Sequence, residues 1–435
     1  MRLPGGFGRF HRDARLFLVT TAVSGGALSL YWIDFNLYLG SLGFSPATIG
    51  VVATVGSIAG ALTAFPASAA SDRLGRRTIM GGGLALAMVA VIGLLLVDAL
   101  PAIILFAALW SIGQQSLMVV QSPFLAEHSD LEHRNELFAA QSAIQMMTNV
   151  GAAVLGGVLA TTIAAAAGLD RDGPGTYRII LVIMAILLVV ALATIGLLTD
   201  DRPSSRRGRH RQRPTGEPAA VPRDAGRVRT LMGVTIEDRG RFVRLLFPGF
   251  LIATGAGQVI PFLNLFVQHK FGLDLASLNA LFAFTSLGTV AAMLAQPRVA
   301  RRFGQVTSVV IVQAASIPFL VVLGFSPLLW TVILAMAVRN SLMNAGNPIF
   351  AAFAMEHVAP TERATLAAAM SVLWQVGWVI GGAWYALLQA TLGFDGGYAV
   401  NFATVILLYS VATALYWTWF RDVDRRALEA RQTGA

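Results

Sequence analysis

Long apolar runs, separated by short polar stretches, recur along almost the whole chain. A run of about 20 apolar residues crosses the hydrocarbon core of a bilayer as a helix. The periodicity is helical and differs from the ten-residue alternation of an outer-membrane barrel. The pattern predicts an all-α polytopic membrane protein with twelve transmembrane helices, over 16–42, 47–70, 78–98, 101–126, 137–166, 177–198, 244–269, 276–296, 306–325, 327–353, 365–391 and 397–420.

The composition supports a membrane protein and gives no sign of an enzyme. Of the 435 residues, 56% are hydrophobic and 13% are charged, about half the charge of an average soluble domain. The absence of cysteine excludes disulfides, thiolate metal sites and cysteine nucleophiles. The sequence contains no HExxH, GxSxG or Walker motif. We therefore expect no catalytic residues, no metal and no cofactor.

The stretch 200–240 is the one break in the apolar pattern, and it divides the helices into six plus six. It is rich in Arg, Pro, Ser and Gly, a composition typical of a linker. The expected units are an N-terminal six-helix bundle over 1–199, the linker over 200–240, a C-terminal six-helix bundle over 241–421 and a tail over 422–435.

An internal repeat supports this division. A shift of 229 positions brings "EHSDLEHR" (127–134) onto "EHVAPTER" (356–363), and it also brings Gly43 onto Gly272. The same shift brings "SDRLGRR" (71–77) onto "ARRFGQV" (300–306). One constant shift across three separated loops indicates a duplicated six-helix unit.

The net charge of +9 is distributed unequally between the two sides of the membrane. Twelve helices place both termini on one side, and 28 of the 32 Lys and Arg residues fall there. The positive-inside rule then predicts cytoplasmic termini, in what we expect to be a bacterial inner (plasma) membrane. We interpret the basic run 206–213 as a topology determinant attracted to anionic lipid; a nucleic-acid-binding arm is the alternative. The expected partners are the lipid bilayer and no nucleic acid, and the expected state is a monomer.

The loop after the second predicted helix carries a family signature. Its residues read Asp-Arg-x-Gly-Arg-Arg, in a chain of six plus six helices with a long central linker. This resembles the major facilitator superfamily of secondary transporters, and the resemblance implies two pseudo-symmetric six-helix bundles around a central cavity. The residues that match are Asp72, Arg73, Gly75, Arg76 and Arg77. Two residues depart from the family pattern: Ser68 replaces a usual glycine, and Arg301 replaces the aspartate in the second copy.

The resemblance implies that Asp72 faces the start of helix 11 when the cytoplasmic side is closed. Arginines beside it can bridge to nearby carboxylates; the alternative is that they only fix topology. We expect Arg301 or Arg302 to pair with an acid of the loop between helices 4 and 5. The glycine pairs Gly56/Gly60 and Gly377/Gly381 fit a sliding contact between helices 2 and 11. The expected cytoplasmic gate comprises Asp72, Arg73, Gly75, Arg76, Arg77, Glu127, Arg134, Arg301, Arg302, Glu356 and Arg363.

Polar groups at membrane depth are costly and are candidates for function. Two are charged: Asp34 in helix 1, on one face with Ser24, and Arg339 in helix 10. Helices 1, 4, 7 and 10 line the central cavity in the family, and all four carry polar groups here. The expected cavity and proton-coupling residues are Asp34, Arg339, Tyr31, Tyr38, Trp110, Gln114, Gln115, Gln258, Asn264, Asn340 and Asn344. The alternatives are a structural Asp34–Arg339 ion pair and, for each amide taken singly, bonding between helices.

These groups indicate a mechanism. An acid in a cavity can load and release a proton between alternating states, and aromatic residues could stack on a flat or amphipathic substrate. The aromatic candidates are Tyr31, Trp32, Trp110, Trp374 and Trp378. We expect a secondary active transporter that moves a small molecule by alternating access coupled to protons, with export of a small amphipathic compound or drug favoured. The alternatives are a metabolite-uptake symporter and a transport-dead receptor or scaffold.

Overall fold

A computed structural model of the chain describes residues 10–128, 134–170, 172–199, 238–286, 288, 305–358 and 362–432. Almost all of these residues are helical. The elements are α1 (Arg12–Ser41), α2 (Pro46–Leu74), α3 (Arg76–Leu96), α4 (Leu100–Glu127), α5 (Arg134–Ala166), α6 (Pro174–Gly196), α7 (Arg239–Val259), the 3-10 turn η3 (Ile260–Phe262), α8 (Leu263–Phe271), the apolar helix Leu275–Ser286, α10 (Gln305–Phe325), α11 (Leu329–Glu356) and α12 (Arg363–Gln432).

The apolar runs of the sequence correspond to these helices. Within the described residues, nine helical segments are long and apolar enough to span a membrane. One of them, Arg239–Phe271, is a single crossing broken by η3. Another, α12, is two helices joined at Gly393, whose φ of 68° ends the first and starts the second. Counting both halves of α12, together with α11 and Leu275–Ser286, gives the twelve predicted crossings. The second half of α12 runs to Gln432, into the segment expected as a tail.

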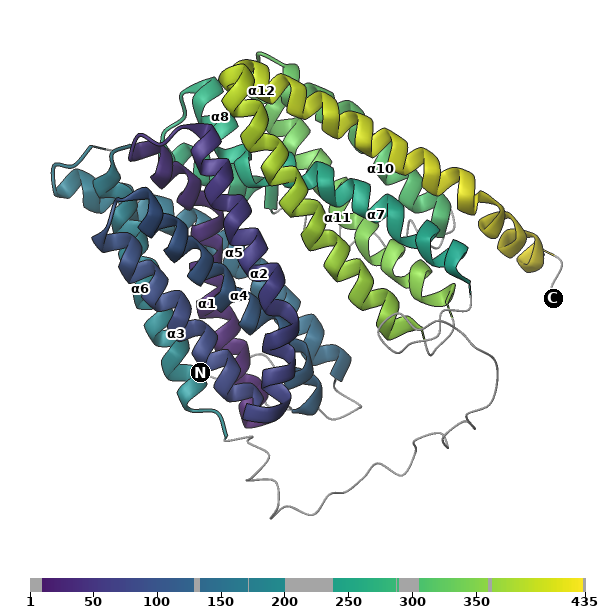
Figure 1. Cartoon of the computed structure of the whole chain (residues 1–435), viewed down its shortest axis with the longest axis horizontal. Coiled ribbons are helices and arrows are strands. Elements are labelled where there is room, and N and C mark those ends of the chain that lie inside the picture. The colour runs from purple at the N-terminus through teal and green to yellow at the C-terminus, as the bar shows by residue number, and fades with distance from the viewer. Residues whose placement is uncertain are drawn as a thin grey trace.

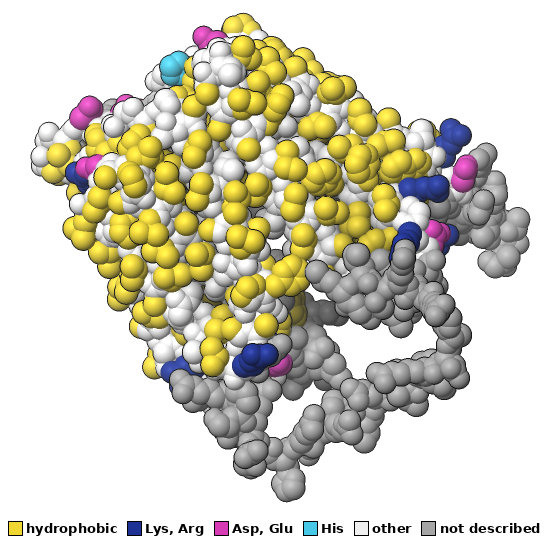
Figure 2. Space-filling view, in the orientation of Figure 1, with side chains coloured by type: hydrophobic (Ala, Val, Ile, Leu, Met, Phe, Trp, Pro, Cys, Tyr) yellow, Lys and Arg dark blue, Asp and Glu magenta, His cyan; other side chains and the backbone are white. Residues whose placement is uncertain are grey.

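The helices form two bundles, one from α1–α6 and one from α7–α12 (Figure 1). We call the end where α1 begins the terminal end, and the opposite end, with the loops 42–45 and 272–274, the distal end. The bundles lie together at the distal end and diverge at the terminal end, near the N-terminus (Figure 1). Figure 2 shows apolar side chains over the length of both bundles and charged side chains gathered near their ends. This is the distribution that a bilayer requires.

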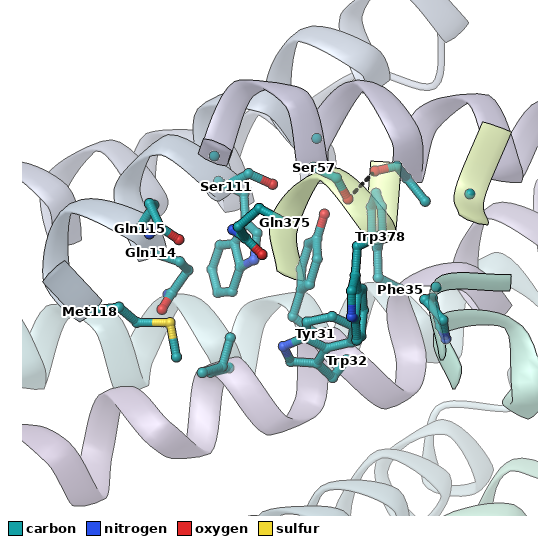
Figure 3. A pocket seen from close by; sticks show the side chains of 18 of the residues that line it. Tyr31, Trp32, Phe35, Ser57, Ser111, Gln114, Gln115, Met118, Gln375 and Trp378 are labelled. Carbon is teal, nitrogen blue, oxygen red and sulfur yellow. Dashed lines mark hydrogen bonds between the residues drawn. The ribbon is translucent and has the colours of Figure 1, made fainter. Parts of the chain in front are cut away.

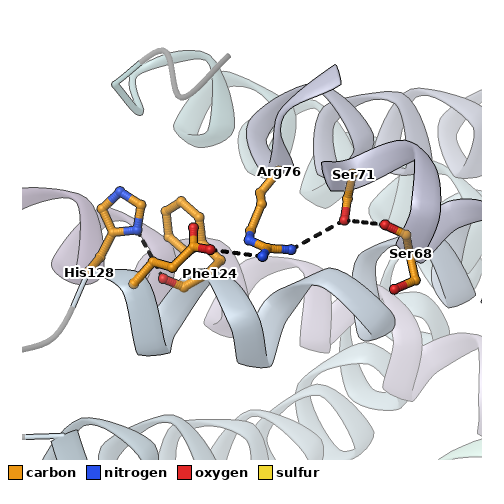
Figure 4. Close-up of polar contacts among 6 residues, drawn as sticks. Ser68, Ser71, Arg76, Phe124 and His128 are labelled. Carbon is orange, nitrogen blue, oxygen red and sulfur yellow. Dashed lines mark hydrogen bonds and ion pairs between the residues drawn. The ribbon is translucent and has the colours of Figure 1, made fainter. Parts of the chain in front are cut away.

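Equivalent contacts in the two bundles confirm the repeat of 229 positions. At the terminal end of the first bundle, the Arg76 guanidinium donates to Glu127 at 2.8 Å (Figure 4). At the equivalent place in the second, the Gln305 amide donates to Glu356 at 3.0 Å. The ion pair of the first bundle is therefore replaced in the second bundle by a neutral amide that donates to a carboxylate.

A second pair of contacts repeats as well. The His128 ring stacks on Phe124 with centroids 4.2 Å apart, and its Nδ1 lies 2.9 Å from the Phe124 carbonyl (Figure 4). The His357 ring stacks on Phe353 at 4.1 Å, with its Nδ1 2.8 Å from that carbonyl. Both histidines therefore end a long helix at the terminal end in the same way.

The glycine pairs expected between helices 2 and 11 pack elsewhere, and that expectation was wrong. A Cβ on Gly56 would meet Ser111 Oγ of α4 at 3.0 Å, and one on Gly381 would meet the Thr254 carbonyl of α7 at 2.5 Å. Gly377 likewise packs on α7. Small residues allow close helix approach whichever neighbour they face, so the motif alone did not identify the partner helix. These glycines hold each bundle together.

Candidate functional site

A cavity of 570 Å³ lies between the two bundles. This volume suits a small molecule. Its walls come from α1, α2, α4, the segment around η3 and the first half of α12, so both bundles contribute. The side chains drawn in Figure 3 include Tyr31, Trp32, Phe35, Ser57, Ser111, Gln114, Gln115, Met118, Gln375 and Trp378.

Aromatic rings form a large part of the cavity wall. Tyr31 is stacked between Phe35 and Trp110, with both centroid distances 4.4 Å. Trp32 of the first bundle meets Trp378 of the second edge to face, at 5.5 Å and 85°. All five aromatic residues singled out as possible stacking groups line this cavity. The packed rings fix the shape of the wall, since offset and edge-to-face pairs are the favoured arrangements.

The polar groups of the wall are neutral. Gln114 and Gln115 come from α4 and Gln375 comes from α12; in Figure 3 the first two lie to one side of the view, opposite Trp378. No Asp, Glu, Lys, Arg or His is among the lining residues in the described part of the chain. The arrangement can stack on a ligand and exchange hydrogen bonds with it, without supplying a counter-charge.

The distal end of the cavity is closed by hydrogen bonds between the bundles. The Asn36 amide of α1 donates to the Pro261 carbonyl in η3. In return, the Asn264 amide of α8 donates to the Ile33 carbonyl of α1 at 2.5 Å. The helix is broken here because a proline inside it removes one backbone donor and crowds the preceding turn. The break presents a carbonyl to Asn36, and so the two amides form a reciprocal clasp.

Helices α2 and α12 also meet closely at this end. A Cβ on Gly50 would approach Ala386 Cβ and Tyr385 Cδ1 at 2.9 Å each, and one on Gly382 would lie 2.8 Å from Thr54 Oγ1. Contact at this distance leaves no room for a ligand or water between α2 and α12 at these positions. Gly50 and Gly382 are thus the small residues that join α2 to α12.

Asp34 lies at the interface of the bundles and does not line the cavity. Its carboxylate is 3% exposed, and Oδ1 accepts a hydrogen bond of 3.2 Å from Asn279 of the second bundle. Oδ2 has no hydrogen-bond partner among the described residues. A small void beside it is lined by Tyr38 and Tyr177. Tyr38 donates to the Leu94 carbonyl at 3.0 Å, away from the cavity.

Arg339 is buried inside the second bundle. Its guanidinium donates to the Tyr409 hydroxyl and to Asn340 Oδ1, both at 3.0 Å, and the Asn344 amide donates to the Asn340 carbonyl at 2.8 Å. None of these three α11 residues lines the cavity. Asp34 bonds to Asn279, whereas Arg339 bonds to Tyr409 and Asn340, so the alternative of an ion pair is not the arrangement in this conformation. Gln258 is also buried, beside Gly381.

Of the expected gate residues, the structure describes contacts for Gly75, Arg76, Arg77, Glu127 and Glu356. Arg76 bonds Glu127 and Ser71 (Figure 4). Arg77 donates to the Gly196 carbonyl at 2.5 Å. Gly75, with φ 92°, separates α2 from α3, and Arg73 is exposed. The side chains of Asp72, Arg134 and Arg363, and all of Arg301 and Arg302, lie outside the described residues. The latch of Asp72 and the pairing of Arg301 or Arg302 remain predictions.

Several residues of the site were not found from the sequence. Asn36, Gln375 and the η3 break belong to it, and the signal for the break was Pro261 inside an apolar run that also carries Gln258 and Asn264. Of the eleven expected cavity residues, the structure brings together on the cavity wall Tyr31, Trp110, Gln114 and Gln115.

Comparisons with known proteins agree with this architecture. The family model of the Major Facilitator Superfamily matches residues 17–382. The chain is similar in structure to the nucleoside transporter NupG, with a TM-score of 0.72, 13% identity and coverage of 94% of this chain and 99% of that one. It is also similar to a bacterial homologue of the human lysosomal transporter Spinster in an inward-facing, unoccupied conformation, with a TM-score of 0.70, 15% identity and coverage of 94% and 98%.

A third similar structure is a D-xylose-proton symporter, with a TM-score of 0.68, 11% identity and coverage of 92% and 97%. At these identities the likeness shows the fold alone. Comparison with curated protein sequences gave no match.

Proposed function

Because the chain belongs to the Major Facilitator Superfamily of secondary transporters, we propose that it exports a small molecule through the cavity between its bundles, by alternating access coupled to protons. The observation that carries the proposal is a 570 Å³ cavity between two bundles that touch at one end and diverge at the other. A carrier of this kind has a second conformation in which the distal end is open and the terminal end is closed.

The charge distribution supports an orientation for this cycle. In the sequence, 28 of the 32 Lys and Arg residues fall in the segments that twelve crossings assign to the side of the termini, and the positive-inside rule makes this the cytoplasmic side. The conformation described here is then open to the cytoplasm. On this view the Asn36/Asn264 clasp forms the external gate, and the Asp72 loop closes the opposite side.

Asp34 is the proposed proton carrier. Closure of the distal end buries its carboxylate between two bundles, with one neutral amide as partner. A charged carboxylate is costly in such a place, so the closed end favours the protonated acid. Opening the distal end would part Asp34 from Asn279 and admit water, which stabilises the ionised form. Proton uptake and release are thereby linked to movement of the bundles.

The test is transport in proteoliposomes. A thermal-shift screen of the purified protein against metabolite and drug libraries supplies ligands, and each ligand is then loaded into vesicles under an imposed proton gradient. We expect movement of at least one ligand that accelerates with the gradient and is accompanied by proton movement, reported by pyranine. Ligands that bind but never cross the membrane would make the protein a receptor and refute transport. A rate of ligand transport that does not depend on the proton gradient would refute proton coupling.

A further inference from the structure

Two hydrogen-bond donors of the cavity wall have no hydrogen-bond partner within the described part of the chain. They are the Nε2 amide of Gln114 on α4 and the Nε1 of Trp378 on α12. Gln114 is 7% exposed, and both donor atoms are buried. An unpaired buried donor costs about 1–3 kcal/mol, so the wall is stabilised when a side-chain rotation brings either donor to a hydrogen-bond acceptor of a ligand. One donor comes from each bundle, and a ligand that engages both would bridge α4 and α12.

The surroundings of the cavity disfavour a charged ligand. No Asp, Glu, Lys, Arg or His is among the described lining residues. Asp34 and Arg339 are the two charged residues expected at membrane depth. They bond to Asn279 and Tyr409, and neither lines the cavity. An ion that enters such a site loses hydration without gaining a counter-charge; the aromatic faces offset part of this cost for a cation and none of it for an anion.

The apolar part of the wall offers flat surfaces. Four of the eight tryptophans line the cavity, and two of them remain well exposed, Trp32 at 49% and Trp374 at 38%. Trp32 and Trp378 stand at 85° to each other, so one ring edge and one ring face meet in the wall. Aromatic faces bind planar molecules by stacking.

From these observations we infer that the cavity selects an uncharged, planar molecule that carries hydrogen-bond acceptors, such as carbonyl oxygens or ring nitrogens. Gln114 and Trp378 donate hydrogen bonds to those acceptors. The inference rests on the proposed transport function and names the substrate class of the same cavity.

The experiment measures binding of four matched probes to the intact protein in lipid nanodiscs by equilibrium dialysis. Quinoline-3-carboxamide is uncharged, planar and rich in acceptors. Quinoline-3-carboxylate and 1-methylquinolinium-3-carboxamide keep the ring and add a negative or a positive charge. Cyclohexanecarboxamide keeps the amide without the flat ring. We expect quinoline-3-carboxamide to bind at least about 10-fold more tightly than each of the other three.

Two variants test the named donors. Trp378→Phe keeps an aromatic ring and removes only the N–H group, and Gln114→Leu removes the amide. Each should weaken binding of quinoline-3-carboxamide by about 3- to 10-fold, the loss expected for one hydrogen bond. The matched control is Trp330→Phe, because Trp330 is 81% exposed on the surface of α11 and does not line the cavity. It should bind the probe as the parent does.

Measurements of binding and of flux distinguish the inference about the cavity from the proposed transport function. Equal or tighter binding of a charged probe, or unchanged affinity in Trp378→Phe, overturns the inference even where transport is demonstrated. The probe panel needs no mutation, so a failure of Gln114→Leu to fold leaves the inference testable. Selective binding without any flux supports the inference about the cavity and overturns the proposed transport function alone.

Discussion

Removal of the two clasp amides should open the distal end of the protein. The perturbation is the double substitution Asn36→Ala and Asn264→Ala. Each amide donates to a backbone carbonyl of the opposite bundle, at Pro261 and at Ile33. Neither bond survives if the bundles separate there. The substitutions therefore remove interactions that exist in the distal-closed conformation only.

The magnitude follows from two buried hydrogen bonds. A bond of this kind contributes about 0.5–1.5 kcal/mol in a folded protein, and side-chain bonds between membrane helices average about 0.6 kcal/mol. Loss of both should cost the distal-closed state about 1–3 kcal/mol. That free energy changes the ratio of the two conformations by about 5- to 150-fold. The close contacts of Gly50 and Gly382 remain and limit the effect.

The assay is double electron–electron resonance between spin labels across the distal end. The chain contains no cysteine, so Leu169→Cys and Leu328→Cys give two unique attachment sites. Both positions are exposed, at 43% and 62%, and they lie at the distal ends of different bundles. We expect the double variant to gain a population at longer distance in nanodiscs.

The matched control is Asn344→Ala, which removes a partly buried amide that bonds within α11 and does not cross between bundles. It should leave the distance distribution unchanged. If the clasp variant gives the same distribution as the parent, the two bonds do not hold the distal end closed, and the reasoning fails.

Three further predictions concern Asp34, Asp72 and Gly381. Asp34→Asn should abolish proton-driven accumulation and spare substrate exchange, since exchange needs no net proton movement; full gradient-driven transport by this variant would show that Asp34 is not the carrier. Asp72→Asn should weaken closure of the terminal end and lower flux while the protein stays folded, which labelling of cavity cysteines from each side would reveal; an unchanged inward-to-outward ratio would contradict it. Gly381→Val should lower stability by roughly 1–3 kcal/mol, because its side chain would press on the Thr254 carbonyl; a thermal melt equal to that of the parent would disprove the close packing.

The number of helices and the internal repeat could be predicted from the sequence. Bilayer thickness sets the length of an apolar run, and this constraint acts along the chain without reference to tertiary contacts. The shift of 229 positions is likewise a property of the sequence, and the paired contacts of Glu127 and Glu356 show that equivalent residues occupy equivalent places. The aromatic character of the cavity could also be predicted, since all five aromatic candidates line it.

Only the tertiary structure decided which way each polar side chain faces. Successive residues of a helix point about 100° apart, so the rotation of a helix against its neighbours determines whether a group enters the cavity, the bundle core or the interface. Asp34 is turned to Asn279, Arg339 to Tyr409, and Gln114 into the cavity. The break at η3 shifts this register again and allows Asn264 to reach Ile33. Hydrophobic runs specify membrane crossings, whereas packing between helices sets the rotation of each crossing and hence the chemistry of the cavity.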